Sequence, residues 1–194
     1  MPGLERRFLP LPEAQSFILD GDLLLEGLSN DPIDAAIQHL GNSDWYHAEM
    51  AEWCGQAEYR DLMLLEMTIG GGQAVLMEHQ VKHLDGAVMD VFHRTDLTVP
   101  QRSAIVHYMR HLTGVPYGYR TLFWLALMHR WPGSVLIPRW KDDLPPVCSS
   151  AYAICNEKAT GMDMWPDKDN WEVTPGVLYQ TFEAYYVCSL RATE

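Results

Sequence analysis

The sequence lacks the patterns that mark several common functional classes. Its four cysteines form no C-x-x-C pair, which argues against a zinc knuckle and against a thioredoxin-type redox site. No apolar run approaches the ~20 residues of a membrane-spanning helix; residues 122–128 come nearest and are far too few. The three glycines at 70–72 are not followed by the Lys-Ser/Thr of a phosphate-binding loop. Neither a membrane anchor nor a nucleotide site is therefore expected.

Basic residues are also scarce. The chain has 14 Lys and Arg against 26 Asp and Glu, a formal net charge of -12. Such an acidic protein repels phosphate backbones and anionic lipids, which argues against nucleic acid and membrane surfaces as partners. Pro10 and Pro12 interrupt the segment after Arg6-Arg7, so no apolar region of a signal peptide follows these arginines. With its cysteines expected to be reduced, we expect a cytoplasmic protein.

What the sequence does contain is a globular composition, with 47% hydrophobic and 21% charged residues. Its length fits one domain, residues 1–194, large enough to bury a core. Residue periodicity and turn signals predict strands mainly in the first half, helices mainly in the second, and one closing strand. Strands are expected within residues 17–26, 46–53, 62–69, 74–77, 87–92 and 182–190, and helices within 31–40, 100–112, 120–131 and 147–159. This order predicts an α+β fold with a mostly antiparallel sheet.

Cys148 is the most informative residue, because it follows Pro145-Pro146-Val147 and opens a helix-compatible run. Proline disfavours helical angles in the residue before it but is tolerated in the first helical turn, so a helix is expected to begin near Cys148. Unpaired N–H groups and the positive end of the helix dipole favour a thiolate there. The small neighbours Ser149 and Ser150 leave room for a substrate carbonyl, with the Cys148 N–H as one oxyanion donor.

The remaining cysteines have no comparable surroundings. A lone cysteine is usually a small buried residue. Cys54 follows a strand pattern, and Cys155 and Cys188 lie within apolar patterns. All three are predicted to belong to the core, which leaves Cys148 as the candidate nucleophile.

A cysteine nucleophile needs a base, and the base needs an orienting group. His47, which begins a strand pattern, is the candidate base, although a structural histidine would fit this position equally well. Glu66 is the candidate orienting group, because an ionised side chain inside the apolar run Leu64-Leu65-Glu66-Met67 is costly without a partner. If strands 46–53 and 62–69 are neighbours, Glu66 can lie beside His47; otherwise it points to solvent.

The order of these motifs resembles the YiiX-like permuted papain-fold hydrolases, which are relatives of the NlpC-type peptidases and of the lecithin–retinol acyltransferase group. The resemblance covers about residues 17–190 and rests on Gly21-Asp22 with its apolar strand, His47, Leu65-Glu66, Gly114-Val115-Pro116-Tyr117 and Val147-Cys148-Ser149. It implies a circularly permuted papain-like (NlpC-type) fold with Cys148 as nucleophile, His47 as base and Glu66 as the orienting residue. It also implies that Tyr117 lies near the site, and we expect Tyr46, Tyr117 and Ser149 to contact substrate.

This resemblance implies hydrolysis of an amide or peptide bond, cell-wall peptides included, through an acyl-enzyme. Two departures bear on the substrate: Tyr46 stands where a serine is common before the histidine, and Ser150 stands where an acidic residue is common after Cys-Ser. An acyl-lipid or thioester hydrolase or an acyltransferase could use the same three residues. A binding module that has lost turnover would keep the same fold.

Two histidine pairs suggest a different chemistry. His79 and His83, and likewise His107 and His111, are spaced i, i+4 and share one face of a helix. Together they could supply four metal ligands to a metal-dependent hydrolase, but neither pair matches His-Glu-x-x-His. The leading hypothesis requires neither a metal nor an organic cofactor.

Overall fold

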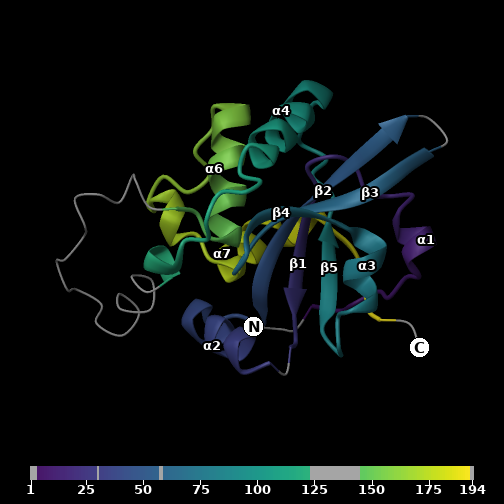
Figure 1. The fold of residues 1–194 in the computed structure, drawn as a ribbon, viewed down its shortest axis with the longest axis horizontal. Helices are drawn as coiled ribbons and strands as arrows, with labels where there is room; N and C mark the ends of the chain where they lie inside the picture. The colour runs from purple at the N-terminus through teal and green to yellow at the C-terminus, as the bar shows by residue number, and fades with distance from the viewer. Residues whose placement is uncertain (1–3, 30, 57–58, 123–144, 193–194) are drawn as a thin grey trace.

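A six-stranded antiparallel sheet forms the centre of the protein. The computed structural model describes residues 4–29, 31–56, 59–122 and 145–192 (Figure 1). The strands follow the order β4-β3-β2-β1-β5-β6, and every neighbouring pair is antiparallel. They span β1 Leu23–Gly27, β2 Trp45–Gln56, β3 Tyr59–Thr68, β4 Gly71–Leu76, β5 Val88–Phe92 and β6 Tyr186–Leu190. The predicted α+β class and antiparallel sheet are confirmed.

Helices cover both faces of this sheet. They are α1 Leu11–Ala14, α2 Pro32–Gly41, α3 Met77–Lys82, α4 Val99–Arg110, α6 Cys148–Thr160 and α7 Pro175–Phe182, with short 3-10 turns at Asn170–Glu172 and Glu183–Tyr185. Figure 1 shows α4 and α6 side by side, and these two helices contact each other and β2 and β3. The helix α3 packs on β3 and β4. Among the described residues, no helix is both long enough and apolar enough to cross a membrane.

The closing strand is shorter than the sequence pattern predicts. Residues 182–185 do not belong to it, because α7 extends to Phe182 and a 3-10 turn precedes Tyr186. Thr174 caps α7 by accepting a hydrogen bond from the Val177 N–H, and Pro175 occupies the first turn. These start signals favour a helix over the strand pattern. Most of the expected helix at residues 120–131 lies outside the described residues.

Side-chain alternation along the strands builds two cores, one on each face. In β3, Leu62 and Leu64 pack in one core, while Leu65 and Met67 pack in the other, beneath α4 and α6. Full burial of a leucine contributes roughly 1.5–3 kcal/mol. The period of two places Glu66 on the same face as Leu64, a position where a charged side chain needs a partner.

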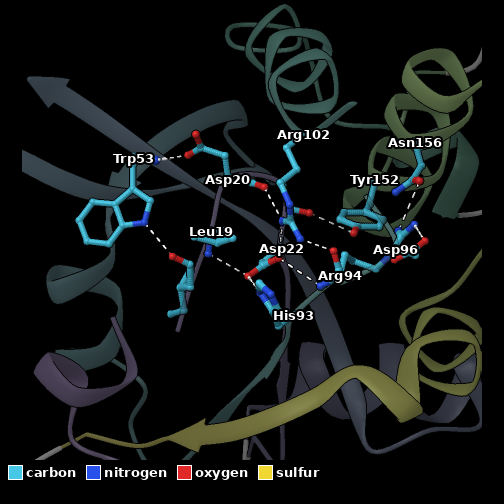
Figure 2. A network of polar contacts seen from close by, with 12 residues as sticks. Leu19, Asp20, Asp22, Trp53, His93, Arg94, Asp96, Arg102, Tyr152 and Asn156 are labelled. Carbon is cyan, nitrogen blue, oxygen red and sulfur yellow. Dashed lines mark hydrogen bonds and ion pairs between the residues drawn. The ribbon is translucent and has the colours of Figure 1, made fainter. Parts of the chain in front are cut away.

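Asp22, at the start of β1, holds a buried polar network (Figure 2). Its carboxylate accepts hydrogen bonds from Arg102 Nη1 of α4 at 2.7 Å and from His93 Nδ1 at 2.8 Å. It also accepts from the backbone N–H groups of Leu19, at 2.9 Å, and Arg94, at 3.2 Å. A buried carboxylate with this many donors is fully compensated for the water it has lost.

The same network connects the sheet to α6. The Tyr152 hydroxyl donates to the Gly21 carbonyl at 3.3 Å, and Arg94 Nη1 donates to Asn156 Oδ1 at 3.4 Å. Tyr152 and Asn156 both belong to α6, and Figure 2 shows them on the side of the network that faces this helix. The helix that begins with Cys148 is therefore fixed against the sheet by directional contacts as well as by apolar packing.

Candidate active site

Cys148 is the first residue of α6 and is almost completely buried, with 4% exposure. The Val147 N–H donates to the Ser150 hydroxyl at 2.8 Å, which satisfies one of the donors at this helix start. Burial alone raises the pKa of the Cys148 thiol, but the charge and hydrogen bond of His47 and backbone hydrogen bonds from Ala48 and Ser149 outweigh it. The result is a pKa below the ordinary value, as a nucleophilic thiolate requires. The predicted helix start is confirmed.

His47 lies in β2 at a β-bulge. Glu26 of β1 pairs with His47 and Gly27 with Trp45, which leaves Tyr46 as an extra residue on β2. Bulges re-aim neighbouring side chains. Here the imidazole contacts Glu66 on the adjacent strand and Cys148 on α6. The sequence carries no signal for the bulge, because register is a property of two strands.

The imidazole of His47 connects the thiol to a carboxylate. Its Nε2 atom lies 2.7 Å from Glu66 Oε2 and donates to it, which leaves Nδ1 as the nitrogen for the Cys148 thiol. Burial lowers the pKa of His47, but the charges of Cys148 and Glu66 and its hydrogen bonds to both raise it well above the ordinary value. The two shifts favour the charged forms of both groups, a thiolate and an imidazolium.

Glu66 is buried, so the solvent-facing alternative is excluded, and its position beside His47 is the one that neighbouring strands predict. Its second oxygen, Oε1, accepts from Gln73 Nε2 of β4 at 2.8 Å. Burial raises the pKa of Glu66, but the hydrogen bonds from His47 and Gln73 outweigh it and hold the pKa below its ordinary value. Gln73 is a contact that sequence reasoning missed, although it lies directly opposite Glu66 in the β3–β4 hairpin.

A cavity of about 320 Å³ opens beside His47 and Glu66. Tyr46 lines it, and its hydroxyl donates to Glu26 Oε2 at 2.9 Å. Tyr117 lines it as well, and burial together with the nearby Cys148 raises the pKa of its hydroxyl. The other lining residues are Glu26, Asp34, Ile37, Met67, Thr68, Ile69, Gln73 and Gln80.

Ser149, expected to contact substrate, is held differently. Its side chain is buried, and its hydroxyl donates to the Val173 carbonyl at 2.6 Å. This bond ties the start of α6 to the segment before α7. Of the three residues expected to contact substrate, Tyr46 and Tyr117 line the cavity and Ser149 does not.

A further acidic residue, Glu49, lies beside the site and was not anticipated from the sequence. It sits opposite Glu66 in the β2–β3 pair, and its Oε1 is 3.8 Å from His47 Nε2. It is 1% exposed, and no N–H or O–H donor reaches either of its oxygens. Burial, then the charges of Glu26 and Glu66, raise its pKa well above the ordinary value. In the sequence, the only indication of its position is that Glu49 follows His47 by two residues, which places both side chains on the same face of a strand.

The two histidine pairs do not assemble a metal site. His83 Nδ1 contacts the His79 carbonyl at 2.7 Å on α3, and His111 Nδ1 contacts the His107 carbonyl at 2.8 Å at the end of α4. All four residues are exposed. Within the described part of the chain, the one group of three or more candidate ligands is His47, Glu49 and Glu66. The alternative built on the histidine pairs is therefore wrong about its ligands.

The free cysteines differ in exposure. Cys155 and Cys188 are buried, as predicted, and burial raises the pKa of their thiols to about 12 and about 11. Cys54 is half-exposed, so its assignment to the core is wrong. It lies near the end of β2, where its sulfur accepts a hydrogen bond from Arg110 Nη2 at 3.0 Å.

No family model and no curated protein matches the sequence. Among solved structures, the fold is similar to the crystal structure of the metalloprotein YiiX from Escherichia coli O157:H7, with a TM-score of 0.55 over 76% of this chain and 69% of that chain. The fold is YiiX-like. At 19% identity the similarity to YiiX concerns the fold alone. The sequence resemblance is thus confirmed for the YiiX-like fold, while the permuted papain-like topology and the NlpC-type relationship stay predictions.

Proposed function

We propose that the protein is a cysteine hydrolase that cleaves an amide or peptide bond. The observation that carries the proposal is that His47, whose Nε2 lies 2.7 Å from Glu66 Oε2, also lowers the pKa of the buried Cys148 thiol. Three separate elements contribute these side chains, and each side chain sits in surroundings that favour its charged form. A nucleophile, a base and an orienting carboxylate in hydrogen-bond contact are the minimum set for thiol-based acyl transfer.

The chemistry follows from these positions. The Cys148 thiolate attacks the carbonyl carbon, and the Cys148 backbone N–H donates to the developing oxyanion. Protonated His47 gives its proton to the leaving amine as the C–N bond breaks, which leaves a thioester on Cys148. Neutral His47 then takes a proton from water, the resulting hydroxide attacks the thioester, and the carboxylic acid leaves. Glu66 stays ionised throughout and holds the imidazole in place through its Nε2–H.

The cavity lined by His47 and Glu66 is the proposed binding site for the substrate. This cavity combines the aromatic rings of Tyr46 and Tyr117 with the amides of Gln73 and Gln80. Aromatic surface with a few polar groups suits a peptide backbone and its side chains. Amide- and peptide-containing molecules, cell-wall peptides among them, are therefore the proposed substrate class.

The test is site-selective alkylation followed by turnover. Iodoacetamide at neutral pH is expected to modify Cys148 before the other thiols, and a mixed peptide library is expected to be cleaved by the wild type but not by C148S. His47→Ala should lower kcat/KM by about 10²–10⁴. The variant C54S is the matched control, because Cys54 is the more exposed thiol and lies away from His47. Labelling of Cys148 no faster than Cys155 would overturn the proposal.

A further inference from the structure

Glu49 is a buried acid without a donor of its own. Its side chain is inaccessible to solvent, and neither carboxylate oxygen receives a hydrogen bond. Its neighbours are two further carboxylates, Glu26 and Glu66, and the imidazole of His47. The contact with Glu66 becomes a hydrogen bond only if one of the two carboxyls keeps a proton. Such an orphaned polar group is costly and calls for a ligand.

We propose that His47, Glu49 and Glu66 bind a divalent transition-metal ion of the zinc type. One candidate ligand atom from each residue lies within 4.8 Å of the other two. One imidazole nitrogen and two carboxylate oxygens are ligands that Zn²⁺ accepts, and three protein ligands leave a fourth position for water. His47 and Glu66 also line the cavity, which provides an entry path.

The present geometry is close to what a bound ion needs. Tetrahedral Zn²⁺ with bonds of about 2.0–2.2 Å separates its ligand atoms by roughly 3.3–3.6 Å. In the structure, His47 Nε2 is 3.8 Å from Glu49 Oε1 and 2.7 Å from Glu66 Oε2. Movements below about 1 Å would satisfy both separations. Gln73 already holds the second oxygen of Glu66, which leaves Oε2 for the ion.

Charge supports the same assignment. Glu49 and Glu66 lie opposite each other in the β2–β3 pair, so two acidic side chains face one point in the site. A divalent cation between them would balance the charge of two carboxylate ligands. Among the described residues, the exposed histidine pairs belong to no group of three or more candidate ligands.

Metal binding and hydrolysis would exclude each other at this site. To bind an ion, His47 Nε2 must release its proton to solvent and donate its lone pair, while Nδ1 keeps its proton. The imidazole then has no free nitrogen with which to take a proton from water. This consequence rests on the proposed function, whereas the metal site itself rests on geometry alone.

The experiment measures Zn²⁺ binding by the full chain after removal of any tag and treatment with a chelator. Competition with a chromophoric chelator gives the stoichiometry and the affinity for the wild type, E49Q, C148S and E52Q. Glu49→Gln keeps the shape of the side chain but removes its charge. Glu52→Gln is the matched control, because Glu52 is a buried carboxyl on the same strand that pairs with Arg110 of α4 instead. Thermal unfolding confirms that each variant is folded.

We expect one Zn²⁺ per chain in the wild type, C148S and E52Q, and an affinity at least about tenfold weaker in E49Q. Bound Co²⁺ should lack the intense thiolate-to-cobalt charge-transfer band, since no sulfur is a ligand. Equal binding by E49Q and the wild type would overturn the proposal. So would loss of binding in C148S, because the ion would then sit on the thiol and imidazole. Absence of binding in the wild type would overturn it as well.

The experiments can refute the proposed metal site and the proposed hydrolase activity independently. An unreactive Cys148 combined with Zn²⁺ binding that depends on Glu49 removes the proposed hydrolase and keeps the metal site. A reactive Cys148 in a chain that binds no Zn²⁺ gives the reverse outcome. If both proposals hold, Zn²⁺ should abolish turnover of the peptide library, and the chelator should restore it.

Discussion

His47 Nε2 lies 2.7 Å from Glu66 Oε2, with the two residues on adjacent antiparallel strands. This contact decides the orientation of the imidazole, because Nε2 is occupied and Nδ1 is left for the thiol on α6. A carboxylate in this position also favours the protonated imidazole, which in turn stabilises the thiolate of Cys148. Through this hydrogen bond, Glu66 in the sheet influences the reactivity of Cys148 at the start of α6.

Replacing Glu66 by glutamine tests this link. The variant keeps the size of the side chain but loses the charge, so the pKa of His47 should fall and that of Cys148 should rise. A hydrogen bond to a charged group is worth about 1.5–3 kcal/mol, so kcat/KM should fall about ten- to a hundredfold. The pH profile of Cys148 alkylation measures the shift in pKa. An unchanged profile would show that Glu66 has no influence on the pair.

The pH dependence of alkylation in the wild type tests the thiolate itself. Because the pKa of Cys148 is lowered, its thiolate should persist at neutral pH, and labelling should slow only as the pH falls through that pKa. Cys155 and Cys188, with pKa values raised to about 12 and about 11, should react only under strongly alkaline or unfolding conditions. Mass mapping of iodoacetamide adducts across pH separates the three. A common pH profile for all of them would contradict this.

The Asp22 network should be essential for stability. Asp22→Asn removes the carboxylate that pairs with buried Arg102, and breaking a buried pair costs about 3–5 kcal/mol. Urea unfolding measures the loss. The matched control is Asp61→Asn at an exposed position of β3, where a change within about 0.5 kcal/mol is expected. Equal effects of the two substitutions would show that the network in Figure 2 contributes no special stability.

Replacing Ser149 tests whether its hydroxyl holds α6 in place or contacts the substrate. Ser149→Ala removes the hydrogen bond to the Val173 carbonyl and leaves that carbonyl unsatisfied, so unfolding free energy should fall by about 1–3 kcal/mol. If Ser149 only anchors α6, the KM for a cleaved peptide should stay unchanged. A raised KM with unchanged stability would instead place the hydroxyl in contact with substrate.

Local sequence features predict most of the elements that carry the site. The proline pair before Cys148 and the helix-compatible residues after it act within one turn, so the start of α6 follows from neighbours in the chain. Glu66 stands out for a similar reason, because an acid among apolar strand residues needs a partner wherever the strand packs. The prediction of the closing strand is wrong at its start, because the cap at Thr174 and Pro175 begins a helix that extends to Phe182.

Contacts between strands were much harder to predict. The sequence shows that 45–56 and 59–68 form strands, but not that Glu49 faces Glu66 or that Gln73 holds its second oxygen. The sequence predicts Cys54 in the core, whereas in the structure it is half-exposed near the end of β2. Each of these facts depends on register or on how far a strand extends beyond the helices that cover it.

The reactive residues can therefore be identified from local sequence: a cysteine at a helix start, a histidine opening a strand, and an acid in an apolar run. These follow from backbone preferences and from the cost of burying charge, which act over a few residues. Whether these residues come into contact depends on long-range packing and strand register. The bulge at Tyr46 and the strand register bring distant segments within hydrogen-bond distance, and they also place His47, Glu49 and Glu66 together in the site that we propose for a metal.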